Sequence, residues 1–118
     1  MSDPIEVTAR AIAAQLAAEH GPGVVAEVDA ALYARRRAER PRQFVDPYSL
    51  GSLIVAIATL AWTIYADLRE RTPEPPPQEV ERQVLMELRE QGAAERQDAE
   101  RITAIAVTET IRAAREDH

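Results

Sequence analysis

The sequence contains no cysteine and no lysine, and it is poor in histidine, glycine and aromatic residues. The absence of cysteine excludes disulfide scaffolds, thiol catalysis and thiolate metal sites. Aromatic residues make up only 4% of the chain and glycine occurs four times, which disfavours a β-sandwich. The two histidines are His20, beside a glycine at an expected helix end, and His118, the last residue. We therefore expect no catalytic residues, no metal site and no cofactor.

The residues that are abundant point to one helical domain. Alanine, arginine, leucine, glutamate and glutamine are good helix formers, and all 14 basic residues are arginine. A length of 118 residues suits one domain and is too short for two of ordinary size. The net charge is −6, and residues 72–118 hold eleven acidic residues against six arginines. Because the chain as a whole is acidic, we do not expect a nucleic-acid partner.

Start and stop signals predict an all-α domain over residues 1–118, with about five helices packed round a central uncharged helix. Asp3 followed by Pro4 is typical of a helix start, and Asp46 followed by Pro47 repeats the device. Four prolines among residues 73–77 predict a stiff, extended connector over residues 72–78. The predicted helices span residues 4–19, 24–39, 47–71, 79–91 and 98–115.

Residues 47–66 are twenty consecutive residues without charge. As a helix they would be about 30 Å long, enough to cross the hydrocarbon core of a membrane. Tyr48 at one end and Trp62 and Tyr65 at the other are typical of membrane interfaces, and the arginines before the segment would keep the N-terminus cytoplasmic. A single membrane span is therefore one interpretation. A helix that is buried first and inserted later is another.

We favour a third interpretation, in which this segment is the core helix of a bundle. Only eight of its twenty residues are strongly apolar, and a span would leave two small fragments with hardly any core of their own. Four amphipathic helices can instead wrap one helix that is apolar on all sides. The residues expected in the core, or in the span, are Leu50, Leu53, Ile54, Ile57, Leu60, Trp62 and Ile64.

The last predicted helix has two apolar faces. At about 100° per residue, Val107, Ile111 and Ala114 fall opposite a face that contains Ile102 and Ile105. One face would pack within the chain and the other would form an association surface; alternatively, both faces are buried inside one bundle. The expected association surface consists of Val107, Ile111 and Ala114, with Arg36, Arg37 and Arg40 as the electrostatic complement to acidic helices.

Two apolar strings, residues 46–55 (DPYSLGSLIV) and 60–68 (LAWTIYADL), resemble segments of short actinobacterial all-helical proteins. Some of those are similar to the adaptor modules associated with effectors in bacterial conflict systems. The resemblance implies helix-mediated, homotypic association without catalysis.

We therefore expect a cytoplasmic, non-enzymatic adaptor or scaffold that associates with itself or with another helical protein. The alternative is a single-pass protein of the plasma membrane, with residues 47–66 spanning it.

Overall fold

Five α-helices make up most of the chain that the structure describes, which is residues 3–37, 50–92 and 98–116. In the computed structural model no β-strand occurs among these residues. The all-α fold class predicted from the sequence is thus confirmed. The helices are α1 (Pro4–His20), α2 (Gly23–Arg37), α3 (Leu50–Arg71), α4 (Pro77–Glu90) and α5 (Ala99–Glu116).

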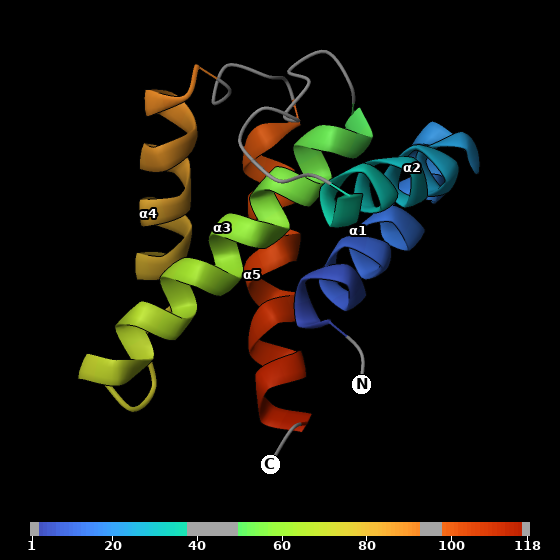
Figure 1. Ribbon diagram of the computed structural model, residues 1–118. Helices are drawn as coiled ribbons and strands as arrows, with labels where there is room; N and C mark the ends of the chain where they lie inside the picture. Colours follow the sequence, from blue (N-terminus) through green and yellow to red (C-terminus); the bar gives the residue numbers. More distant parts are fainter. Residues whose placement is uncertain (1–2, 38–49, 93–97, 117–118) are drawn as a thin grey trace.

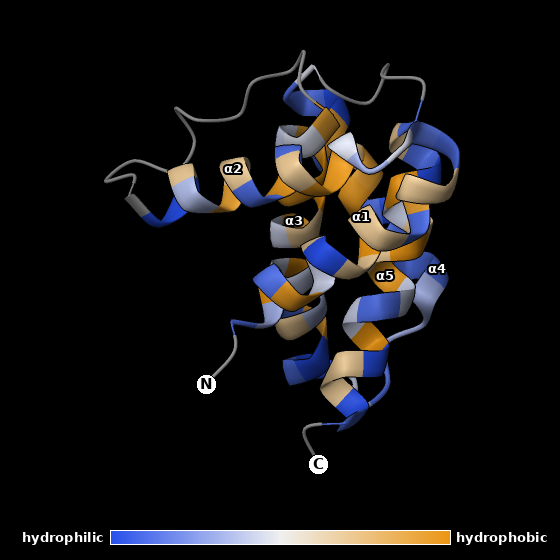
Figure 2. Cartoon of the chain, turned by 90° about the vertical axis from the view of Figure 1, so that its right-hand side faces the viewer, coloured by the Kyte–Doolittle hydropathy of each residue, from blue (hydrophilic) through white to orange (hydrophobic). Residues whose placement is uncertain are grey.

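The central helix is α3, which crosses the molecule diagonally and contacts each of the other four helices (Figure 1). In that view α4 lies on one side of α3, α1 and α2 lie on the other, and α5 runs behind it. Leu53, Ile54 and Ile57 of α3 are almost completely buried. Hydrophobic residues gather where the helices face one another, and hydrophilic residues lie outward (Figure 2). The uncharged segment therefore forms the centre of the hydrophobic core.

The start and the end of α1 are set by local backbone chemistry. Asp3 precedes the helix, and its side chain accepts a hydrogen bond of 2.9 Å from the backbone N–H of Ile5. Pro4 takes the first helical position, where its missing N–H costs no hydrogen bond. Gly21 ends the helix with a φ of +84°, a conformation that glycine adopts without steric cost. The predicted boundaries of this helix are accurate to one residue.

Helices α2 and α3 cross closely at Gly51. A Cβ atom at this position would lie 2.5 Å from the backbone carbonyl carbon of Glu27. The Glu27 carboxylate also accepts a 3.5 Å hydrogen bond from the Gly51 N–H, one of the first-turn amides of α3 that have no partner within the helix. The glycine thus permits the close crossing, and Glu27 in turn caps the helix that it contacts.

Helices α1 and α5 pack in antiparallel directions. The side-chain amide of Gln15 donates a 3.1 Å hydrogen bond to Glu109, and the guanidinium of Arg101 forms two hydrogen bonds to the carboxylate of Glu19. Residue numbers therefore fall along α1 as they rise along α5. The first described helix lies against the last.

The segment between α3 and α4 is shorter than predicted. Pro76 is extended, with φ −62° and ψ 135°, and α4 begins at Pro77 rather than at residue 79. Proline suits the first helical position because its φ is already helical. The connector therefore covers residues 72–76. The predicted helical residues 38–39 and 47–49 lie outside the described part of the chain.

Candidate functional site

A hollow of about 300 Å³ lies where the end of α3, the proline-rich connector and the last turns of α5 meet. The first two segments follow one another in the sequence, whereas α5 is the last helix of the described chain. We call this hollow the connector groove. It is lined by Tyr65, Arg69, Ile111, Ala114, Arg115 and residues 73–77.

Local sequence explains the shape of the connector groove. After α3 ends at Arg71, the chain bends over residues 72–74 and is extended at Pro76, because a proline fixes its own φ and disfavours helix at the residue before it. Pro75 is buried, so the connector is fastened to the bundle at its middle. The groove wall is consequently stiff and loses little conformational entropy when a partner binds.

The aromatic wall of the groove is held by a short chain of contacts. Tyr65 packs edge-on against Trp62, with ring centroids 6.4 Å apart and an interplanar angle of 86°. The indole N–H of Trp62 donates a 2.8 Å hydrogen bond to the hydroxyl of Thr8. On its other side the Tyr65 ring carries the Arg69 guanidinium, 5.5 Å from the ring centroid. This cation–π contact holds one positive charge at the groove.

The connector groove is cationic although the protein is acidic. Arg69 and Arg115 are both exposed, and neither forms an ion pair with a carboxylate in the part of the chain that the structure describes. Glu74 is the acidic residue of the groove lining, so the two cations outnumber it. Apolar surface from Ile111 and Ala114 lies beside these charges. The groove is thus suited to an amphipathic and acidic partner.

A second hollow of about 300 Å³ lies between α3 and α4, and we call it the α4 hollow. Met86, 48% exposed, is its most prominent apolar residue. Near the beginning of α4, Arg82 pairs with Glu79 at 2.5 Å, and its guanidinium also lies 3.9 Å from the Met86 sulfur. The hydrogen bonds from Arg82 and then Gln83 lower the pKa of the Glu79 carboxyl below its ordinary value. The hollow is lined by Ile64, Arg82, Gln83, Met86, Glu87 and Glu90.

The expected association surface on α5 is corrected by the structure. Val107 is 1% exposed and Ala114 is 4% exposed, so both belong to the hydrophobic core of this chain. Ile111 is partly buried, and with Ala114 it contributes to the connector groove. Because α5 contacts α1, α3 and α4, both of its apolar faces are covered within one bundle, as the alternative interpretation stated.

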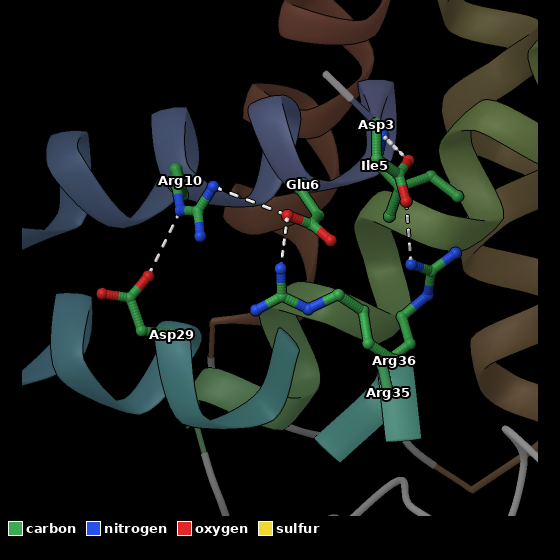
Figure 3. Close-up of polar contacts among 7 residues, drawn as sticks. All are labelled: Asp3, Ile5, Glu6, Arg10, Asp29, Arg35 and Arg36. Carbon is green, nitrogen blue, oxygen red and sulfur yellow. Dashed lines mark hydrogen bonds and ion pairs between the residues drawn. The ribbon is translucent and has the colours of Figure 1, made fainter. Parts of the chain in front are cut away.

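Arg35 and Arg36, near the end of α2, pair with carboxylates at the start of α1 (Figure 3). Arg35 contacts the Asp3 carboxylate at 3.1 Å, and Arg36 contacts the Glu6 carboxylate at 3.6 Å. Arg10 lies between Glu6 and Asp29, at 3.6 Å and 3.2 Å, and extends the network along both helices. Arg36, predicted to complement acidic partner helices, thus also has an ion pair inside the α1–α2 hairpin, while its side chain stays 51% exposed.

Arg40 and the side chain of Arg37, expected beside Arg36 on that surface, lie outside the described part of the chain.

The residues expected in the core or span all contribute to the core of the bundle. Leu53, Ile54 and Ile57 are buried. By length and composition α3 is also the one helix, among the described residues, that is apolar enough to cross a membrane. The partly buried members, which pack against the core, are Leu50, Leu60, Trp62 and Ile64.

The described residues contain no cluster of histidine and carboxylate side chains that could hold a metal ion. His20 lies 4.0 Å from the Asp98 carboxylate, beside the end of α1. No protein family, curated protein or solved structure matches this chain. The resemblance to actinobacterial adaptor modules accordingly stays a prediction from the sequence.

Proposed function

We propose that this chain is a non-enzymatic helical adaptor that associates with itself or with another helical protein through the connector groove. The observation that carries the proposal is the pair Arg69 and Arg115, which have no carboxylate partner in the described chain although the net charge is −6. They flank apolar surface from Ile111. An amphipathic helix with acidic residues would bury that surface and neutralise those charges.

The construction of the bundle supports this role. The groove is built on the ends of two helices that are packed into the core, and its third wall is a run of prolines. Sites on rigid elements bind with little reorganisation. A helix that docks here would meet a surface that is already formed.

The proposed location is the cytoplasm, with the membrane-spanning arrangement as the alternative. That alternative draws on the length and hydropathy of α3. A spanning α3 would place α1 and α5 on opposite sides of the membrane, whereas Arg101 of α5 pairs with Glu19 of α1. The span would also remove α3 from its contacts with four helices. These contacts favour the core role of α3.

Light scattering coupled to size-exclusion chromatography, without detergent, tests the proposal. We expect soluble protein whose mass rises with concentration, and we expect Arg115→Glu to weaken the association. Arg112→Glu is the control, because Arg112 is exposed on the same helix and does not line the groove, although its loss also removes an ion pair with Glu109. Circular dichroism checks that each variant keeps its helices.

Two results would overturn the proposal. One is a wild-type protein that stays monomeric at every concentration and salt level, with a mass in solution that Ile111→Asp does not change. The other is a protein that sediments with membranes and requires detergent for extraction, which would favour the spanning alternative. An oligomer that is equally sensitive to Arg112→Glu and Arg115→Glu would place the association outside the groove.

A further inference from the structure

We propose that the occupant of the connector groove is a second copy of this chain, which inserts the outward face of its α4 around Met86. We call this surface, made of Met86, Glu87 and Glu90, the α4 face. The inference rests on the proposed adaptor function and specifies its partner. In this arrangement the connector groove of one molecule contacts residues that line the α4 hollow of the other.

The α4 face has the chemistry that the groove lacks. Met86 is 48% exposed, which makes it one of the most exposed large apolar residues among those described. Glu87 and Glu90 are exposed and form no ion pair with a described arginine. Earlier in α4, Arg82 pairs with Glu79 and contacts the Met86 sulfur at 3.9 Å, but it forms no ion pair with Glu87 or Glu90. Beside exposed Arg89, the last turns of α4 therefore present one flexible apolar side chain and two negative charges that have no ion pair among the described residues.

The groove provides the complementary set. Arg69 and Arg115 supply two positive charges, and Ile111 and the prolines supply apolar walls. Methionine is unbranched and adapts to irregular apolar surfaces, which suits a hollow of about 300 Å³. With Met86 between the walls, Glu87 and Glu90 of the second copy come within reach of the arginines. Opposite charges at such an interface steer the approach and exclude wrong registers.

The same molecule cannot fill its own groove with its own α4 face. Pro77 begins α4 at the groove, and Met86 lies further along the helix by about 14 Å, at 1.5 Å per residue. On α3, Ile64 lines the α4 hollow and Tyr65 lines the groove, and successive helical residues point about 100° apart. The two surfaces thus open on different sides of the bundle, and the partner has to be another copy.

Complementary charge reversals test this pairing in the full-length protein. One double variant, Arg69→Glu with Arg115→Glu, makes the groove negative. The other, Glu87→Arg with Glu90→Arg, makes the α4 face positive. In each variant alone, the groove and the α4 face carry charges of the same sign. We therefore expect the dissociation constant for self-association to rise by about tenfold or more. In an equimolar mixture, the negative groove of the first variant meets the positive α4 face of the second. The unchanged groove of the second variant meets the unchanged acidic α4 face of the first. The mass should therefore return to that of the wild type.

The control is Arg89→Glu with Arg112→Glu, which changes the net charge as the groove variant does at two arginines that line neither hollow. It should associate like the wild type. Raising the salt concentration should weaken the wild-type oligomer, because charges at an exposed interface are screened over about 10 Å at 0.1 M salt.

The outcomes separate this inference from the proposed function. If the groove variant is monomeric while the α4-face variant associates normally, the groove is a docking site but α4 is not its occupant, and the inference is overturned alone. If the mixture of the two variants stays monomeric although both keep their helices, the inference is likewise lost. If the wild type never associates, the inference and the proposed self-association fall together.

Discussion

Trp62 of α3 donates its indole N–H to the hydroxyl of Thr8 on α1, across 2.8 Å. Thr8 is 1% exposed, and Trp62 is the only tryptophan of the chain. The bond joins residues 54 positions apart, and the Trp62 ring packs against Tyr65, the aromatic wall of the connector groove. One hydrogen bond therefore links the packing of α1 to the position of the groove.

Replacing Thr8 by valine should destabilise the protein by about 1–2 kcal/mol, because it removes the acceptor and leaves the indole N–H without a partner. Tryptophan fluorescence during urea unfolding measures both the stability and the surroundings of Trp62. Thr8→Ser is the control, since it keeps the hydroxyl and should leave the native emission unchanged. Identical emission and identical stability in Thr8→Val would contradict this account of the contact.

Replacing Gly51 by alanine should destabilise the fold by about 1–3 kcal/mol, as overpacking does in a well-packed core. The new Cβ would lie 2.5 Å from the Glu27 carbonyl carbon, so α2 and α3 would have to separate. Gly23→Ala is the matched control, because nothing lies within 4 Å of a Cβ at that helical position. Urea midpoints compare the two, and equal midpoints would mean that the close crossing is not needed.

Thr110 offers a substitution that should not destabilise the protein. Its side chain is completely buried, and the hydroxyl has no hydrogen-bond partner among the described residues. Thr110→Val removes this polar group while keeping the shape, so stability should stay the same or rise by about 1 kcal/mol. Thr103→Val on the same helix is the comparison, because that hydroxyl donates a 2.7 Å hydrogen bond to the Ala99 carbonyl. A clear loss of stability in Thr110→Val alone would reveal a partner for its hydroxyl.

The pair between Glu19 and Arg101 should make stability depend on pH. The hydrogen bond from Arg101 lowers the pKa of the Glu19 carboxyl below its ordinary value of 4.5. A lowered pKa in the folded state stabilises the protein above the unfolded value, and this contribution is lost as the pH falls through the folded value. The difference in urea midpoint between wild type and Glu19→Gln should thus be present at neutral pH and should shrink below about pH 4.5.

Because both side chains of this pair are about half exposed, the difference should be small and should decrease with salt. The control is Arg101→Gln, which removes the same hydrogen bonds from the other partner. The difference in urea midpoint between wild type and Arg101→Gln should depend on pH in the same way. If the urea midpoints of the two variants respond to pH in opposite directions, the pair between Glu19 and Arg101 is not the source of the pH dependence.

Helix boundaries were predictable where the chain carries a local signal. Asp3 and Pro4 fix the start of α1 through a cap and a preset φ, and Gly21 ends it through a left-handed conformation. The proline-rich connector was recognised, but its end was placed too late because Pro77 serves equally well as a first helical residue. Local chemistry therefore predicted most of the secondary structure.

Which residues are buried was harder to predict, because a helical pattern identifies faces and not their neighbours. Val107 and Ala114 were correctly placed on a second apolar face of α5, but that face is covered within the chain. Arg36 was treated as a free cation, although the hairpin of α1 and α2 brings Glu6 to it. The acidic residues at the start of α1 and the arginines at the end of α2 were a signal from which this ion pair could have been predicted.

The connector groove itself escaped prediction. Its residues come from α3, the connector and α5, and no spacing in the sequence relates Arg69 to Arg115. The usable signal was the neighbourhood of Tyr65, Arg69 and the prolines, which lie within a few residues of one another. Only the packing of α5 beside them makes a groove.

The antiparallel contact between α1 and α5 also governs when the fold can form. The pair Glu19 and Arg101 spans 82 positions of the chain, so its formation closes a long loop at an entropic cost. During synthesis α1 and α3 emerge before α5, and the apolar sides that α5 covers stay open to water or to chaperones until it follows. The core of this protein is therefore completed only after its last described helix has left the ribosome.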